Sequence, residues 1–218
     1  MFIGQYISHN YQVLPSDSID YVLSKMDEYH CGQLPVVDGA VYHGLIRYDD
    51  LLEIEDTSIP LQKIGHLLQP IFLFDYQHIY DALQLVASQN HCLVTVLNKQ
   101  HDYQGVLTKQ DILEALNETL GNEEGSIIVL ELGARDNALS HVARIIESEN
   151  TSILSTAVRQ TPDSAKLEMT IKVNKTNIAA VVASLWRNDY VVKATFRDGS
   201  DESDIQSRYE LLMNYLDI

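Results

Sequence analysis

Apolar residues recur along the first half of the chain in a pattern that appears twice. Between Ile19 and Met26, and again between Ile79 and Val86, they follow the i, i+3, i+4, i+7 spacing of a half-buried helix. The two stripes lie 60 residues apart. After each stripe come two short apolar runs separated by a polar turn, which predicts a β-hairpin. The pattern therefore predicts two copies of one structural unit in tandem.

Each copy is predicted to have the order βαββα, and neither copy is large enough to enclose much core alone. Pro60 and Pro70 mark the boundary between the copies, and a polar stretch at 121–125 with a glycine at each end closes the second. We assign residues 1–60 to the first repeat and 61–121 to the second. The predicted elements are an extended segment at 13–15, helices at 19–26 and 50–53, strands at 34–38 and 41–46, then a helix at 79–86, strands at 93–97 and 103–107, and a helix from near Asp111.

Each hairpin ends in a turn that leads into a helix, and the two turns are alike. The first reads Gly44-Leu45-Ile46-Arg47-Tyr48-Asp49-Asp50 and the second Gly105-Val106-Leu107-Thr108-Lys109-Gln110-Asp111, so the glycines and the final aspartates are both 61 residues apart. A helix start has unpaired backbone N–H groups and partial positive charge, so together with the Thr108 hydroxyl it can receive a phosphate.

The other residues of the second turn fit the same chemistry. Asp111 can accept hydrogen bonds from two adjacent hydroxyls, as on a ribose, and Gly105 lets a ligand approach the backbone closely. On spacing alone, an interpretation without a ligand is favoured. In that interpretation Thr108 caps the helix and Asp111 supports the cap from the third helical position.

Composition describes an ordinary soluble globular protein, with 45% apolar and 21% charged residues among 218. The formal net charge of −16 argues against nucleic acid or an anionic membrane as the main partner, since both need a basic surface. A phosphorylated small ligand is compatible with it, because a Debye length of about 8 Å screens distant charge. Residues 1–10 lack the basic start and apolar run of a signal peptide, and no stretch reaches the ~18 apolar residues of a membrane span.

The two cysteines are too few for a disulfide framework, and we expect a cytoplasmic chain with both thiols reduced. His30-Cys31 and His91-Cys92 occupy comparable places in the two copies, and two His-Cys pairs are ligands of the type that zinc takes. Their spacing matches no local metal motif, so a buried cysteine beside a helix-end histidine is favoured and no metal site is predicted. No Ser-His-Asp, Cys-His or paired-carboxylate arrangement stands out, and we predict no catalytic residue.

Beyond the linker at 121–125 the pattern changes to the order βαββαβ. Apolar and polar residues alternate from Leu167 to Val173, the period-2 signal of a sheet with one solvated face. Over residues 126–198 this order predicts a four-stranded antiparallel sheet with two helices on one face. The tail, 199–218, has apolar residues at helical spacing, and we expect an amphipathic helix that docks on its own chain or on a partner subunit. The predicted elements are strands at 127–132, 152–159, 167–173 and 190–197 and helices at 139–146 and 178–185.

The residues of the repeats resemble those of the CBS domain, a family that occurs as tandem pairs. The resemblance is carried by Leu34-Pro35-Val36-Val37-Asp38, then Gly44 and Asp50, and by the 105–111 turn, and it covers about residues 8 to 120. It implies two copies packed through their sheets, with two clefts of which one or both hold AMP, ADP, ATP or S-adenosylmethionine. The hydroxyl residue of the family's turn meets phosphate and the aspartate meets ribose. The candidate ligand-binding residues are therefore Gly105, Val106, Thr108, Asp111, Arg47 and Asp50.

The two copies differ within this motif. The second has both Thr108 and Asp111, whereas in the first Arg47 stands where the hydroxyl is expected, although Asp50 remains. Arginine could contact phosphate directly as a fixed cationic fork. It could equally pair with Asp49 or Asp50 and leave the first cleft empty, and we favour the empty cleft.

The C-terminal pattern resembles the ACT domain, a ferredoxin-like regulatory module that binds amino acids between paired copies. The resemblance rests on element order and on Asn150-Thr151-Ser152-Ile153 after the first helix. The amino-acid site of that family uses a loop of the form Asp-x-Pro-Gly, where this chain has Ala134-Arg135-Asp136-Asn137. We therefore expect a purely structural role for this domain and no binding of free amino acids.

A CBS pair followed by an ACT-like domain makes an α+β chain that resembles a group of bacterial proteins including acetoin-utilisation regulators. The resemblance implies a cytoplasmic, non-enzymatic sensor that needs no cofactor and binds an adenine nucleotide as its regulatory ligand. The ACT-like domain would pair two chains into a homodimer and transmit the change. The alternative is an assembly adaptor with vestigial clefts that works only by dimerising.

Overall fold

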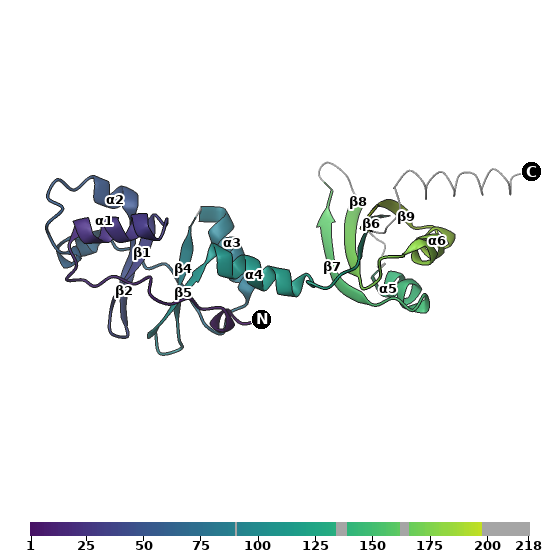
Figure 1. Ribbon diagram of the computed structural model, residues 1–218, viewed down its shortest axis with the longest axis horizontal. Helices are drawn as coiled ribbons and strands as arrows, with labels where there is room; N and C mark the ends of the chain where they lie inside the picture. Colours follow the sequence, from purple (N-terminus) through teal and green to yellow (C-terminus); the bar gives the residue numbers. More distant parts are fainter. Residues whose placement is uncertain (90, 134–138, 162–165, 198–218) are drawn as a thin grey trace, which may run out of the picture. The chain divides into compact units, whose positions relative to one another are not determined.

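The computed structural model describes residues 1–89, 91–133, 139–161 and 166–197 (Figure 1). The chain divides into two compact units, Met1–Leu116 and Asn117–Ile218. Within the described ranges, no helix is long and apolar enough to cross a lipid bilayer. The helix predicted at 199–218 and the Ala134-Arg135-Asp136-Asn137 loop both lie outside the described residues.

Helix α1 (Ile19–Glu28) and the antiparallel strands β1 (Gln33–Asp38) and β2 (Val41–Arg47) form the first repeat, which the short helix α2 (Tyr48–Leu52) completes. Ser18 caps α1, because its hydroxyl accepts a hydrogen bond from the backbone N–H of the third helical residue. The apolar stripe that predicted the helix is its buried face. The buried members of the stripe are Ile19, Val22 and Met26.

The second repeat has the same order of elements and one additional strand. Helix α3 (Ile79–Gln89) leads to β4 (Leu93–Leu97) and β5 (Tyr103–Thr108), an antiparallel pair, and then to α4 (Lys109–Thr119). Strand β3 (Phe72–Phe74) pairs in parallel with β4. The sequence pattern does not predict β3, since three residues are too few to show alternation. Short 3-10 helices, also not predicted, lie at Ile3–Gln5 and Leu61–Leu67.

The segment that precedes the first long helix of each repeat, α1 or α3, packs on the other repeat. The backbone of Ser8 exchanges hydrogen bonds of 2.8 and 2.9 Å with that of Val106, and the backbone of Gln69 does the same with Leu45. Ile3 is fully buried in the core of the second repeat. The N-terminal segment is therefore part of the second repeat's packing, although it lies beside the first repeat in sequence.

The two hairpins meet, so the repeats pack through their sheets as expected. The backbone N–H of Tyr103 in β5 donates to the carbonyl of Ala40, at the tip of the first hairpin (2.8 Å). Tyr103 packs against the first repeat's core, while the hydroxyl of Tyr42 donates to the carbonyl of Ile71 (2.8 Å). Burial raises the pKa of both phenols, that of Tyr42 to about 12. Each repeat thus contributes a partly buried tyrosine to the shared interface.

The C-terminal unit is an antiparallel sheet with helices on one face. Its elements are β6 (Ser126–Gly133), α5 (Leu139–Ser148), β7 (Ile153–Gln160), β8 (Lys166–Val173), α6 (Ala179–Arg187) and β9 (Val191–Phe196). The strands lie in the order β7-β8-β6-β9, and α5 and α6 pack together over the sheet (Figure 1). This is the ferredoxin-like βαββαβ topology. The predicted fold class, a tandem pair followed by this domain, is confirmed.

Candidate ligand site

Asp111 is held by its own chain at the start of α4. Its Oδ2 accepts hydrogen bonds from both the backbone N–H and the hydroxyl of Thr108, each at 2.7 Å. In return, the backbone N–H of Asp111 donates to the Thr108 hydroxyl (3.2 Å). Such reciprocal pairing is a capping box. Helix α4 consequently begins at Lys109, two residues before the predicted start, with Asp111 at its third position.

The close approach that Gly105 permits is made by the protein itself. A Cβ at this residue would lie 2.6 Å from the carbonyl oxygen of Ser8 and would overlap the side chain of Ile7, and φ is +148°, where glycine is favoured. The Ser8 hydroxyl also donates to Oδ1 of Asp111 (3.0 Å), and Val106 is bonded to Ser8 through both backbone groups. Three hydrogen bonds from its own chain thus occupy the carboxylate of Asp111, which leaves one lone pair of Oδ1, beside Ser8, for a ligand hydroxyl.

The corresponding aspartate of the first repeat is held differently. Arg47 occupies the N-cap position of α2 without a side-chain cap, and its guanidinium lies 3.7 Å from the exposed carboxylate of Asp49. Oδ2 of Asp50 is buried yet has no hydrogen-bond partner within the described ranges. An unpaired buried acceptor is unfavourable, so a ligand hydroxyl at Asp50 would satisfy it. The expectation that the first cleft is empty stays a prediction: the Arg47–Asp49 pair is one of the two pairings that it named, whereas the unpaired carboxylate oxygen of Asp50 argues against it.

A cavity of about 350 Å³ lies between the two turns. Helices α2 and α4 both begin at its wall, with Tyr48 and Lys109 as their first residues. The backbone N–H of Tyr48 donates to the carbonyl of Gly32 (2.8 Å), and that of Lys109 donates to the carbonyl of Cys92 (3.2 Å). Each helix start is thus anchored to the segment that leads into its own hairpin. The lining residues are Gly32, Gln33, Arg47, Tyr48, Asp49, His91, Cys92 and Lys109.

The charges around this cavity suit an anion. Arg47 comes from the first repeat and Lys109 from the second, and the carboxylate in the described lining is that of Asp49, which pairs with Arg47. The volume lies within the ~300–1,000 Å³ of small-molecule sites. A larger cavity, of about 500 Å³, runs along β3 and α3, but its described lining contains Asp81 and no basic residue. We therefore favour the 350 Å³ cavity, rather than the 500 Å³ cavity, as the site of a phosphate group.

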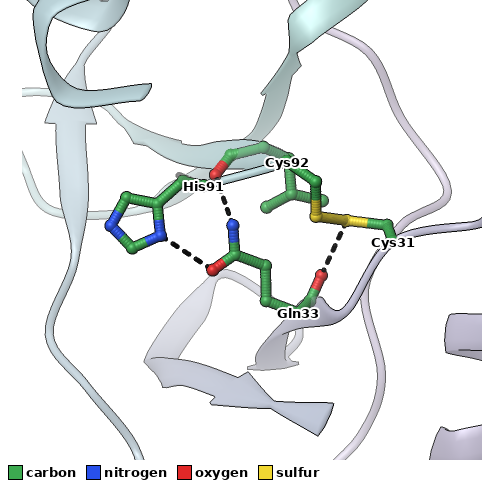
Figure 2. The surroundings of a disulfide bond; sticks show 5 residues. Cys31, Gln33, His91 and Cys92 are labelled. Carbon is green, nitrogen blue, oxygen red and sulfur yellow. Dashed lines mark hydrogen bonds between the residues drawn. A yellow bond between two sulfur atoms is a disulfide. The ribbon is translucent and has the colours of Figure 1, made fainter. Parts of the chain in front are cut away.

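Cys31 and Cys92 form a disulfide, so the prediction that both thiols are reduced is wrong for this structure (Figure 2). Their Cα atoms are 5.8 Å apart, within the usual range for a disulfide. The bond joins the two repeats covalently at the wall of the 350 Å³ cavity. The small number of cysteines suggested that no disulfide forms. The comparable positions of Cys31 and Cys92 in the two copies were the signal that they could lie close together.

A zinc site formed by the two His-Cys pairs does not fit this arrangement. Both sulfur atoms are committed to the disulfide, whereas zinc takes cysteine as a free thiolate. The described part of the chain also contains no group of three histidine, cysteine or acidic residues that could hold a metal ion.

Gln33 and His91 make further contacts across the same junction. Figure 2 shows the side chain of Gln33 reaching from the first repeat to the second, where its Oε1 accepts a hydrogen bond from Nδ1 of His91 (2.8 Å). Its amide nitrogen donates to the carbonyl of Leu93 (3.4 Å). Because Oε1 can only accept, His91 carries a proton on Nδ1.

His91 lines the cavity as a neutral group. It is only 5% exposed, and burial lowers its pKa below the ordinary value, an effect to which the positive charge of Arg47 adds. The positive charge of the cavity therefore comes from Arg47 and Lys109. Sequence reasoning did not select Gln33, His91 or Lys109 as site residues. The available signals were that Lys109 lies within the 105–111 turn and that His91 precedes Cys92.

Comparison with known protein families identifies the two repeats. The family model of the CBS domain matches the chain twice, over residues 3–56 and 65–118. Each match spans the helix and hairpin of one repeat. No curated protein sequence matches the chain.

Solved structures with a similar fold include a CBS domain pair/ACT domain protein from Thermotoga maritima, 22% identical, with a TM-score of 0.49 over 56% of this chain and 100% of that one. A CBS domain protein from Pyrobaculum aerophilum complexed with AMP is 18% identical, with a TM-score of 0.45 over 54% of this chain and 99% of that one. The CBS domain of a bacterial CNNM/CorC family Mg²⁺ transporter in complex with ATP is 14% identical, with a TM-score of 0.42 over 52% of this chain and 85% of that one. The nucleotides named here are ligands of those proteins.

Proposed function

The N-terminal unit of this chain is a tandem pair of CBS domains, and on that premise we propose that the protein is a non-enzymatic regulatory sensor for an adenine nucleotide. The ligand belongs to the class of AMP, ADP, ATP and S-adenosylmethionine, and no cofactor is required. It binds between the two CBS domains. The ACT-like domain pairs two chains and transmits the change, in the cytoplasm.

The observation that carries the proposal is a cavity with cations from both CBS domains. The planar guanidinium of Arg47 can bind two phosphate oxygens at once. Lys109 adds a second charge at the start of α4, where the helix end itself favours an anion. Asp50 lies one helical turn beyond Arg47, and its buried Oδ2 can accept a hydrogen bond from a ribose hydroxyl. Arg47 and Lys109 can therefore bind phosphate together within the cavity, whereas Asp50 does not line it and would meet a ribose only after its side chain turns toward the ligand.

The second CBS domain offers another position, built from Gly105, Val106, Thr108 and Asp111. A ribose there has two hydroxyls for the one remaining lone pair of Asp111, so one of them competes with the Ser8 hydroxyl for Oδ1 or with Thr108 for Oδ2. Breaking such hydrogen bonds to a charged group requires about 1.5–3 kcal/mol each. We therefore propose that the cleft of Arg47 and Asp50 has the higher affinity.

Pairing through the ACT-like domain is supported by the edges of its sheet. Val158 on edge strand β7 is 51% exposed, and Val191 and Phe196 on edge strand β9 are 55% and 49% exposed. Exposed edges with apolar side chains favour pairing with another chain. We propose a homodimer on this basis, while the finer resemblance to acetoin-utilisation regulators stays a prediction.

The alternative function is an assembly adaptor whose clefts bind nothing. Thermal unfolding with a panel of adenine nucleotides separates the two, because a ligand at 100 times its Kd stabilises the folded state by about 2.7 kcal/mol. We expect at least one nucleotide at millimolar concentration to raise the midpoint of the wild type. The absence of a shift with every nucleotide would favour the adaptor.

Two matched variants show which of the two clefts binds the nucleotide. Asp50→Asn should lower nucleotide affinity by roughly 10- to 150-fold, the equivalent of ~1.5–3 kcal/mol. Asp111→Asn should destabilise the free protein by about 1 kcal/mol through the loss of its cap, and should keep the nucleotide-induced shift of the midpoint. If only Asp111→Asn abolished the shift, the ligand would lie in the second cleft, and equal losses would mean that both clefts are occupied.

A further inference from the structure

We propose that the Cys31–Cys92 disulfide is a redox switch that sets the affinity of the cavity between the two CBS domains for its nucleotide. The inference rests on the proposed function and adds the regulation of the same site. The oxidised form, with the disulfide closed, is the high-affinity form. Reduction to two thiols lowers the affinity.

The switch depends on the fact that each CBS domain supplies one of the two positive charges of the cavity. Arg47 belongs to the first CBS domain and Lys109 to the second, so the spacing of the two cations depends on how closely the domains are held at this wall. The disulfide fixes that spacing, with its Cα atoms 5.8 Å apart. A phosphate group that needs both cations binds best when their geometry is set in advance, because ordering them on binding reduces affinity.

Both ends of the disulfide are directly connected to the helix starts. Gly32, the neighbour of Cys31, accepts the backbone hydrogen bond of Tyr48 at the start of α2, and Cys92 itself accepts that of Lys109 at the start of α4. A displacement of either cysteine therefore moves the backbone carbonyl that anchors a helix start. Reduction of the disulfide therefore changes the positions of Arg47, Asp50 and Lys109 through these two backbone hydrogen bonds.

Without the disulfide, this wall is held by non-covalent contacts, among them the hydrogen bonds of Gln33 and the packing of Leu93 in the first repeat's core. Gln33 bonds to His91 at 2.8 Å and to the carbonyl of Leu93 at 3.4 Å, beyond the usual limit of about 3.2 Å for a strong N–H···O bond. Such bonds contribute ~0.5–1.5 kcal/mol each, so they permit opening motions that a covalent bond forbids. The reduced form consequently populates wider cavities, and its apparent affinity falls in proportion.

We place the thiol exchange at Cys92, because it is the more exposed of the two cysteines. Cys92 is partly exposed and lines the cavity, whereas Cys31 is 6% exposed. The thiolate of a dithiol, attracted by Arg47 and Lys109, attacks Sγ of Cys92. The S–S bond breaks, a mixed disulfide forms, and the Cys31 sulfur leaves as a thiolate that takes a proton.

The second thiol of the dithiol then completes the exchange. It attacks the mixed disulfide and releases Cys92 as a thiolate, which also takes a proton, so the dithiol is oxidised to its own disulfide while the protein gains two electrons and two protons. After reduction, the Cys31 thiol can donate a hydrogen bond to the carbonyl oxygen of Gln33, which lies 3.2 Å from its sulfur. In the oxidised form the same contact cannot be a hydrogen bond, since the sulfur carries no hydrogen.

The composition of the chain agrees with such a role. In the proposed cytoplasmic location, a disulfide outside hyperthermophiles is usually catalytic or redox-sensing. No catalytic arrangement accompanies this one in the sequence. The chain has only two cysteines, so reduction has a single target.

The test measures the affinities of ATP, AMP, ADP and S-adenosylmethionine for the full-length chain in its oxidised form and after reduction with dithiothreitol. We expect reduction to weaken binding by roughly 5- to 150-fold, the range of typical coupling between sites. The Cys92→Ser variant should bind like the reduced wild type and should not respond to dithiothreitol. Thermodynamic reciprocity adds a second readout, because saturating ATP must make the disulfide harder to reduce by the same factor.

The outcomes separate the switch from the function on which it rests. Equal affinity in the oxidised and reduced forms, or tighter binding by the reduced form, overturns the switch and leaves the sensor function intact. Absence of binding by ATP, AMP, ADP and S-adenosylmethionine in both forms overturns both. If Cys92→Ser does not fold, the oxidised and reduced wild type still decide the question, since they have the same sequence.

Discussion

Reduction of the Cys31–Cys92 disulfide should strongly destabilise the N-terminal unit. The bond joins residues 61 apart in sequence. A cross-link of this span removes loop-closure entropy from the unfolded chain, worth about 4 kcal/mol at 25 °C in the chain-entropy treatment. For a unit the size of Met1–Leu116, whose entropy of unfolding is ~2.1 cal/mol/K per residue, this corresponds to a midpoint lower by roughly 10–20 °C.

Differential scanning calorimetry of the full chain, with and without dithiothreitol, measures this difference. Both cysteines lie in the N-terminal unit, so a transition that belongs to the C-terminal unit should not move and serves as an internal reference. The Cys31→Ser variant is the matched control, because its midpoint should be low and insensitive to reductant. If the oxidised and reduced midpoints agreed within ~2 °C, or if native protein without reductant were alkylated at both cysteines, the reasoning would be refuted.

Three further predictions concern packing, pH and assembly. Gly105→Ala should destabilise the N-terminal unit by ~1–3 kcal/mol in denaturant unfolding, because its Cβ would overlap Ile7, and an unchanged midpoint would contradict the described packing of the N-terminal segment. Since the pKa of Tyr42 is raised from 10.0 to about 12, its contribution to stability is complete below pH 10 and is lost as the pH rises through 12. Tyr42→Phe should therefore show a shallower loss of stability over that interval, and an equal slope would contradict the burial of this hydroxyl. Light scattering at micromolar concentration should give twice the chain mass of 24.6 kDa, and a monomer mass would exclude the proposed homodimer.

Local patterns in the sequence were sufficient to predict most of the fold. The stripes beginning at Ile19 and Ile79 gave α1 and α3, because an amphipathic helix shows its buried face directly in its spacing. The bounds of β4, Leu93–Leu97, agree with the prediction. Strand β3 was missed because it depends on its parallel pairing with β4, a tertiary contact that leaves no periodicity in three residues.

The site was predicted less completely, because its distinctive features depend on contacts between distant residues. Spacing identified Thr108 and Asp111 as a helix cap, which the structure contains. It did not show that Ser8 occupies the second oxygen of Asp111, since the two residues are 103 apart. The disulfide was mispredicted for the same reason, as only the packing of the two repeats brings Cys31 to Cys92.

The most direct test of the account is a calorimetric titration of ATP and AMP into variants of the cavity's two cations. The Arg47→Gln/Lys109→Gln double variant removes both positive side chains from the lining, and Lys63→Gln removes one exposed lysine outside it as a matched control. With charge-assisted contacts worth ~1.5–3 kcal/mol each, we predict that the double variant binds roughly 100-fold or more weakly than the wild type. The control should bind as the wild type does. Wild-type affinity in the double variant would contradict the claim that this cavity holds the nucleotide.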